Sequence, residues 1–188
     1  MKILGKHKRL WDKDFWEILT AEFLSVTGGI IGGILLSVLT NKLEMIPALL
    51  ILLPGFLEMR GNIGGSLAAR LSADLHLKKI SAKLKETSIL KDNVLASSIL
   101  AIFIALILGL LAYLSVYLIF GINNTNIIFI ALIASVLSLI LEMPLTIVAT
   151  FWLFKHGYDP DDIMGPYVTT IGDVFSILAL IITVMVII

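Results

Sequence analysis

Three oxygen-bearing side chains recur at intervals of four residues near the middle of one apolar stretch. They are Glu58, Asn62 and Ser66. Positions i, i+4 and i+8 of an α-helix lie on one face, so a helix here would align a carboxylate, an amide and a hydroxyl. Arg60 is two residues from Glu58 and therefore points to a different side of the same helix.

The last apolar stretch repeats this spacing with Gly165, Thr169 and Asp173, and Ser176 follows one turn later. Asp173 is the only acid in that stretch. Upstream lies a run of Asp-Pro-Asp-Asp that begins at Asp159. One interpretation of this run is a helix N-cap with Pro and acids in the first turn. The other is an acidic mouth for a cation on the cytoplasmic side, and the two are compatible.

Carboxylate, amide and hydroxyl oxygens favour a hard cation such as Mg²⁺, Ca²⁺ or Mn²⁺. Mg²⁺ gives up its water reluctantly, so it needs only one or two carboxylates around a wide, wet site. One Asp173 per chain supplies half of such a site, and a twofold axis along a pore would bring two together. We therefore predict a cation path in which Asp173 supplies the charge that holds the hydrated ion, with Asn62 and Thr169 in contact with its water shell.

Enzyme chemistry has little support in this sequence, and we predict that the protein is not an enzyme. No nucleophile–base pair or nucleotide-binding motif is visible. His7, His76 and His156 fall in segments that we expect to be cytoplasmic and far from the acids. The sequence has no cysteine, which excludes thiol catalysis and a cysteine metal site.

Four ionisable residues lie well inside apolar stretches: Glu58, Arg60, Glu142 and Asp173. Each costs from about 2.5 kcal/mol upward in lipid, which marks each as a functional candidate. We expect Arg60 to pair with a carboxylate, either Glu58 or Glu142. The glycine-rich run at 61–66 predicts either irregular backbone that lines a cavity or a packed kink.

The composition shows what must position these residues. The chain is 59% hydrophobic and 15% charged, with a net charge of zero and a mean hydropathy of +1.03. Soluble domains are about 45–50% apolar and about 25% charged. A soluble enzyme, a disordered chain and a nucleic-acid partner are therefore excluded, and membrane lipids become the expected surroundings.

Five apolar stretches are long enough to cross a bilayer as helices, which takes about 20 residues each. They run from about Ile18 to Thr40, Met45 to Leu71, Asn93 to Phe120, Ile127 to Phe154, and Pro166 to Ile188. We predict an all-α membrane protein with a basic cytoplasmic tail at residues 1–17 and a single five-span transporter domain at 18–188. Non-helical spans are disfavoured because a barrel would show short alternating segments.

The distribution of Lys and Arg predicts the orientation. Twelve of the 14 basic residues fall in the N-terminal tail, in the connection between the second and third spans, or at Lys155. Since positive residues accumulate on the cytoplasmic side, the N-terminus is expected inside and the C-terminus outside the cell membrane. The basic connection is a topology signal, or alternatively a site for anionic lipid.

Small residues recur every four positions in three of the expected spans, which lets helix backbones approach closely. The clearest ladder is Ser97, Ala101, Ala105 and Gly109, and glycines at 28, 29, 32 and 33 form another. The ladders indicate packing inside one bundle or, alternatively, a face between two copies.

Two motifs make the sequence resemble the pore domain of the MgtE magnesium transporters and their solute-carrier relatives. The first is Pro-Gly-Phe-Leu-Glu-Met-Arg-Gly-Asn at 54–62, followed by Ala-Arg-Leu-Ser at 69–72. The second is Asp159-Pro160, followed by Gly-Pro-Tyr-Val-Thr-Thr-Ile-Gly-Asp at 165–173. The resemblance covers about residues 18–188, and the chain has one such unit where the solute-carrier relatives have two.

The resemblance implies a parallel homodimer with a pore between the subunits, lined by the second and fifth spans. By the same resemblance, Asp173 matches the ion-binding pore aspartate, Asn62 the pore asparagine, and Asp159 an acid near the cytoplasmic mouth. Ser66 and Gly165 stand where bacterial MgtE usually has Gln or can have a bulkier residue. No cytoplasmic magnesium-sensing domain is present in this sequence.

The sequence therefore predicts a divalent-cation channel or transporter, most readily for Mg²⁺, that acts as a homodimer. One alternative is an exporter of the same fold, in which Glu58 or Glu142 carries a coupling proton or Na⁺. The other is a membrane scaffold without transport. Channel or carrier mechanism, direction of transport and the metal preferred stay open at this point.

Overall fold

The computed structural model describes residues 13–38, 40, 46–82 and 87–187. Within these residues the chain forms five long helices and no strand. They are α1 Lys13–Val38, α3 Pro47–His76, α4 Ser88–Phe120, α5 Asn126–Lys155 and α6 Pro160–Ile187. Each apolar stretch predicted from the sequence corresponds to one helix. His7, the start of the second predicted stretch at Met45, the end of the fifth at Ile188 and the basic residues within 1–12, 41–45 and 83–86 lie outside the described residues.

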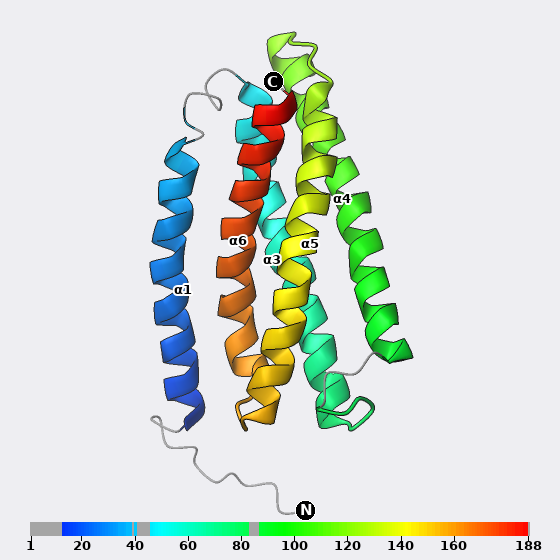
Figure 1. The fold of residues 1–188 in the computed structure, drawn as a ribbon. Coiled ribbons are helices and arrows are strands. Elements are labelled where there is room, and N and C mark those ends of the chain that lie inside the picture. The colour runs from blue at the N-terminus through cyan, green and yellow to red at the C-terminus, as the bar shows by residue number, and fades with distance from the viewer. Residues whose placement is uncertain (1–12, 39, 41–45, 83–86, 188) are drawn as a thin grey trace, which may run out of the picture.

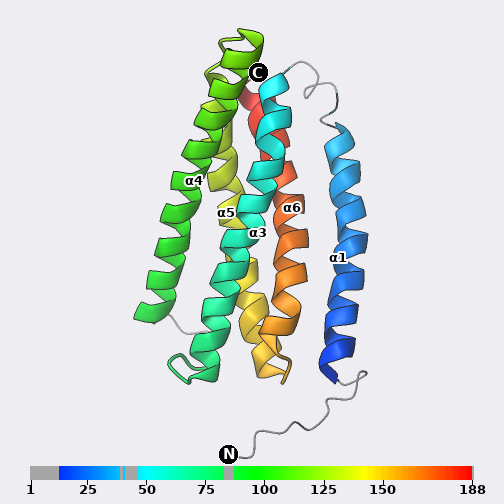
Figure 2. The same cartoon turned by 180° about the vertical axis from the view of Figure 1, so that it is seen from behind.

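The five helices run the length of one bundle and alternate in direction along the chain (Figure 1). The first helix starts at one end of the bundle and the last finishes at the opposite end. α3 packs against α4, α5 and α6, whereas α1 packs only against α6 in the described part of the chain. Figure 2, the view from behind, also places α1 at one edge beside α6 and α4 at the other.

Local chemistry explains several helix boundaries. The Thr87 hydroxyl accepts a hydrogen bond from the Leu90 N–H at 3.2 Å and caps the start of α4. α4 ends at Gly121, whose φ of 67° lies in the left-handed region that glycine adopts without strain. Asp159 Oδ1 accepts the Asp161 N–H at 3.0 Å at the start of α6. The predicted cap at the Asp-Pro-Asp-Asp run is therefore confirmed.

One expectation about the backbone needs correction. α3 is helical without a break through Pro54 and through the glycine-rich run at 61–66, where irregular backbone was one of the two predictions. A continuous helix accommodates these glycines, because Gly64 packs closely against other helices and Gly65 faces open space. α1 begins at Lys13, so its first residues overlap the segment predicted as the N-terminal tail.

The core lies between α3, α4, α5 and α6. Phe56, Leu52 and Ile130 are fully buried there. All four residues of the small-residue ladder on α4 are buried, and a side chain at Gly109 would lie 2.9 Å from the Ile128 Cα. This ladder therefore packs inside the bundle. In α1, Gly28 and Gly32 face α6, whereas nothing lies within 4 Å of a side chain at Gly29 or Gly33.

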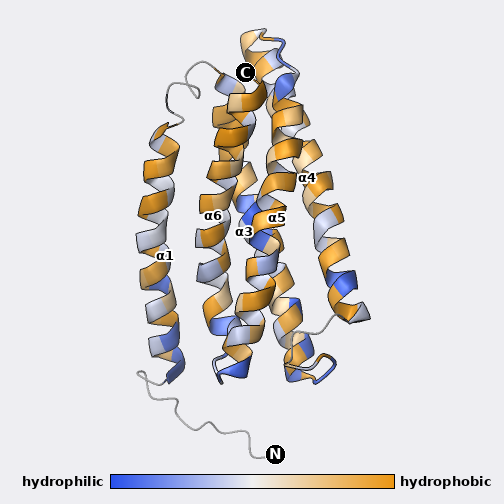
Figure 3. Cartoon of the chain, viewed as in Figure 1, coloured by the Kyte–Doolittle hydropathy of each residue, from blue (hydrophilic) through white to orange (hydrophobic). Residues whose placement is uncertain are grey.

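The outer surface of the bundle is strongly apolar, as Figure 3 shows by the hydrophobic colour along most of each helix. Among the described residues, α1, α4, α5 and α6 are long and apolar enough to cross a membrane. α3 is equally long, with 30 residues, but falls short of that composition because it carries Glu58, Arg60 and Asn62 at its middle.

Candidate functional site

A groove of about 490 Å³ lies between α3 and α6 and opens at the surface of the bundle. Ten residues line it: Pro54, Leu57, Glu58, Gly61, Asn62, Gly65, Ser66, Gly165, Thr169 and Asp173. The sequence analysis named seven site residues, and six of them meet here. Two helices that lie almost a hundred residues apart in the chain thus supply one continuous polar lining.

The face of α3 that borders the groove is the one predicted from the spacing of four. Glu58, Asn62 and Ser66 are all exposed on it. The Asn62 amide donates a hydrogen bond to Glu58 Oε1 at 3.1 Å, which orients the carboxylate along the groove. Gly61 and Gly65 lie on the same face and leave the groove wide, since a side chain at Gly65 would meet nothing within 4 Å.

The opposite wall comes from α6, where Gly165, Thr169 and Asp173 occupy successive turns. The Thr169 hydroxyl donates to the Gly165 carbonyl at 3.0 Å, so its oxygen lone pairs remain available toward the groove. Asp173 is half-buried. In the part of the chain that the structure describes, no ion pair or hydrogen bond neutralises the Asp173 carboxylate.

Ser176, expected one turn further along the same line, lies elsewhere. It is fully buried, and its hydroxyl lies 3.2 Å from that of Ser138 on α5. The groove residues of α6 are four residues apart, whereas Ser176 is only three residues from Asp173. Its side chain therefore points to a different side of the helix.

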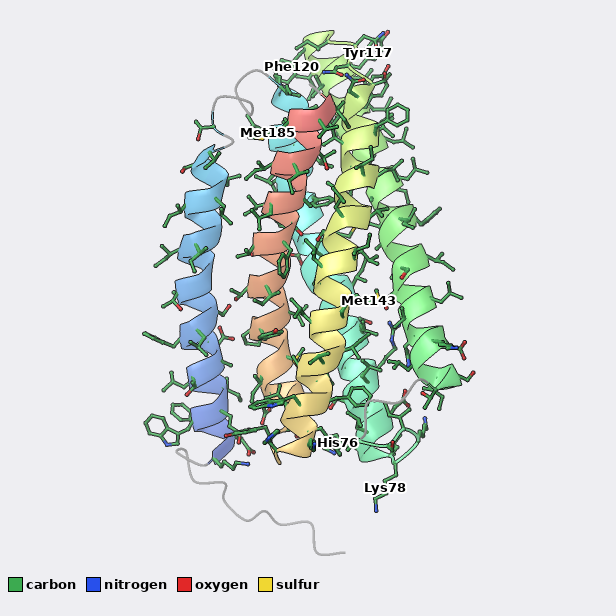
Figure 4. The ribbon with its side chains drawn as sticks, in the orientation of Figure 1. His76, Lys78, Tyr117, Phe120, Met143 and Met185 are labelled. Carbon is green, nitrogen blue, oxygen red and sulfur yellow. The ribbon has the colours of Figure 1, made fainter. Side chains whose placement is uncertain are left out.

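Asp159, the seventh predicted site residue, is not part of the groove. It lies where α6 begins, and its Oδ1 is 3.5 Å from His76 Nε2 at the end of α3. One ligand atom each from His76, Asp159 and Asp161 lie within 4.8 Å of one another. Figure 4 shows His76 at the lower end of the bundle, close to Lys78 and far from Phe120 and Tyr117 at the other end. The expectation that the histidines lie far from the acids is wrong for His76.

Arg60 does not face the groove. Its Nε donates to Glu142 Oε2 at 3.0 Å and its Nη2 donates to the same oxygen at 2.5 Å. The guanidinium and the carboxylate are 3% and 2% exposed, so this is a buried ion pair between α3 and α5. Of the two partners left open by the sequence, the structure selects Glu142. Glu58 and Asp173 then remain as the two carboxylates of the groove.

These features define an all-helical, multi-pass membrane protein, as far as the described residues show. Its helices α3 and α6 meet at an oxygen-lined groove. An arrangement of two unpaired carboxylates, an amide and hydroxyls can hold a hard cation together with its water.

The comparison with protein families agrees with this class. The chain belongs to the MgtE family, because the family's model, described as a divalent cation transporter, matches residues 53–183. The matched segment runs from α3 into α6 and includes every residue that lines the groove. MgtE is a family of transporters and not of enzymes. No curated protein and no solved structure matches the chain.

Proposed function

We propose that this protein carries Mg²⁺ across the cell membrane through a pore formed by the α3–α6 grooves of two copies. The observation that supports this most strongly is the groove itself, which gathers six of the seven site residues predicted from the sequence, five of them with side-chain oxygen. The family to which the chain belongs transports divalent cations, and the proposal names the ion and the path.

The position of the groove favours a second copy of the chain as its cover. Glu58 and Asn62 are exposed near the middle of α3, in a bundle that exposes many large apolar side chains. A carboxylate in contact with lipid at that depth costs about 2.5–3.5 kcal/mol on insertion scales. Two parallel copies related by a twofold axis would cover both grooves and enclose one path between them.

The dimensions of the groove suit a hydrated ion. Six waters occupy about 180 Å³ at liquid density, which fits within the volume of about 490 Å³ on one chain. Mg²⁺ keeps most of its water in such sites. Two copies of Asp173 across the axis would attract a divalent ion twice as strongly as a monovalent one, because the Coulomb energy scales with the charge of the ion.

The proposal includes five crossings of the membrane, with α3 as one of them. α3 is similar in length to the other helices and extends along the same bundle. Of the polar residues near its middle, Glu58 and Asn62 line the groove and Arg60 lies in the ion pair. Among the described residues, His76, Lys78, Lys79 and Lys155 lie at the end of the bundle where α1 begins. By the positive-inside rule this end is cytoplasmic, so the N-terminus lies inside and the C-terminus outside.

A cation-coupled exporter of the same fold is the second candidate, and one observation bears on it. Glu142 is occupied by Arg60, whereas Glu58 faces the groove beside Asp173. Glu58 is therefore the residue that would carry a coupling proton or Na⁺. In proteoliposomes, divalent-cation flux that requires a proton or Na⁺ gradient of the opposite direction would favour the exporter.

Asp173→Asn tests the proposal because it preserves the size and hydrogen bonding of the side chain and removes its charge. We expect Mg²⁺ uptake into proteoliposomes to fall at least tenfold, with the size-exclusion profile unchanged. Asp92→Asn is the matched control, since Asp92 is an exposed acid of α4 outside the groove, and it should transport as the wild type does. Wild-type flux in Asp173→Asn would remove Asp173 from the mechanism, and no flux in the wild type would favour a scaffold.

A further inference from the structure

The buried ion pair of Arg60 and Glu142 uses only part of its hydrogen-bonding capacity. Both donated hydrogen bonds go to the same oxygen, Oε2. Arg60 Nη1 and Glu142 Oε1 are buried and have no hydrogen-bond partner among the residues that the structure describes. A cavity of about 10 Å³ adjoins the pair and also contacts Gly64 and Thr146, which is room for about one water molecule.

The free oxygen of Glu142 lies between two glycines on different helices. A side chain at Gly64 of α3 would lie 2.5 Å from Oε1 and would collide with Val168. A side chain at Gly172 of α6 would lie 3.2 Å from the same oxygen. The carboxylate from α5 therefore fills the space between α3 and α6, and both helices have glycine where they meet it.

This contact lies directly behind the cation groove. Gly172 precedes Asp173 in the chain, and Gly64 precedes Gly65, so each glycine that faces Glu142 is next to a residue that lines the groove. Figure 4 shows Met143, the residue after Glu142, near the middle of α5. Gly61 and Thr169 also meet closely across the groove floor, where a side chain at Gly61 would lie 3.5 Å from the Thr169 hydroxyl.

We propose that Arg60 and Glu142 are positioning residues which set the spacing of α3 and α6 and thereby the choice among divalent cations. The Glu142 carboxylate keeps the two helices apart by its own width, and Arg60 holds that carboxylate in place. The distance between Glu58 on one wall and Asp173 on the other follows from this spacing. The inference rests on the proposed function of the groove.

Stability alone does not account for such a pair. Replacing a buried ion pair with well-packed apolar residues of similar volume is often neutral or stabilising, because both charges lose their hydration when buried. The pair also adds no net charge to the site. Its position behind the groove, with a glycine on each neighbouring helix to accommodate it, is what a spacer with a fixed shape requires.

The test replaces both partners in the full-length protein, with Arg60→Met and Glu142→Leu together, and measures Mg²⁺ and Ca²⁺ uptake in competition. We expect Glu142→Gln alone to lower the melting temperature, since it leaves the guanidinium unpaired, and the double variant to recover most of that loss. We expect the double variant to shift the Mg²⁺-to-Ca²⁺ preference at least fivefold toward Ca²⁺. Ca²⁺ accepts irregular coordination and sheds water more easily, so it tolerates a less defined groove.

Ser135→Ala is the matched control. Ser135 is fully buried on α5 like Glu142, but its hydroxyl contacts the Ala101 carbonyl of α4 at 3.4 Å. It should leave the cation preference unchanged. Gly172→Ala is a second test variant, and it keeps both charges of the ion pair. Its added methyl group would press on the Glu142 carboxylate, and we expect it to shift the Mg²⁺-to-Ca²⁺ preference at least twofold.

The outcomes separate this inference from the proposed function. If the wild type transports neither cation, the proposed function fails. If the wild type prefers Mg²⁺ and the double variant folds with the same preference, the pair is structural only and the inference is overturned. If the double variant does not fold, an unchanged preference in Gly172→Ala overturns it, and a shifted preference supports it.

Discussion

Adjacent glycines on α3 offer a comparison that isolates the packing behind the groove. Gly64 is buried and faces Val168 and Glu142, whereas Gly65 faces the open groove with nothing within 4 Å of an added side chain. Gly64→Ala and Gly65→Ala introduce the same methyl group one residue apart on the same helix. We expect the first to destabilise the protein and the second to leave it folded and at least as stable.

The magnitude follows from the two close contacts at Gly64. Both neighbours are held in place: Val168 is fully buried and branched at Cβ, and Glu142 is fixed by two hydrogen bonds from Arg60. Overpacking at the upper end of the usual range costs about 3 kcal/mol. Alanine recovers about 0.5–1 kcal/mol of helix propensity at either position. The two variants should therefore differ in stability by about 3 kcal/mol.

Thermal unfolding in detergent, followed by tryptophan fluorescence, measures this difference. A difference of about 3 kcal/mol corresponds to about 6–12 °C in a chain of this size. The close packing of α3 and α6 against the Glu142 carboxylate would be refuted if both variants melted within 2 °C of each other. It would also be refuted if Gly65→Ala were the less stable of the two.

Two further predictions concern the ends of the bundle. Cysteines at Lys2 and Ile188, placed one at a time in this cysteine-free chain, should be labelled from opposite sides of the membrane, and labelling from the same side would contradict five crossings. Asp159→Ala should lower stability by about 1 kcal/mol through loss of the cap on Asp161, whereas Asp159→Asn should keep the cap and the melting temperature. A loss of Mg²⁺ flux in Asp159→Asn would show that Asp159 also serves the cation path.

The groove could be predicted from the sequence because helical periodicity is local. Glu58, Asn62 and Ser66 share a face of any regular helix, and no tertiary information is needed to align them. The two groove walls could not be joined by that reasoning, since Glu58 and Asp173 meet only through the packing of α3 on α6. The family resemblance supplied that step for the pore lining.

Other contacts depended on packing that periodicity does not encode. The partner of Arg60 stayed open between Glu58 and Glu142, because both are acids and only the placement of α5 against α3 decides between them. His76 and Asp159 are separated by more than eighty residues and meet because α3 ends where α6 begins. The continuous helix through Pro54 is also a tertiary result, since packing outweighs a local cost of about 1 kcal/mol for each glycine and about 3 kcal/mol for the proline.

α3 is less apolar than the other four helices, and its place in the bundle explains why. A helix that contacts lipid on most of its surface needs a long apolar stretch, which α1 and α4 have. α3 is covered by α4, α5 and α6, so only a small part of its surface is left to contact lipid. It can therefore carry Arg60, which faces α5, and Glu58, which faces the groove. Under the proposed dimer its remaining face is covered as well. The helix that would carry the proposed cation path is thus the one whose composition falls short of that of the four apolar helices.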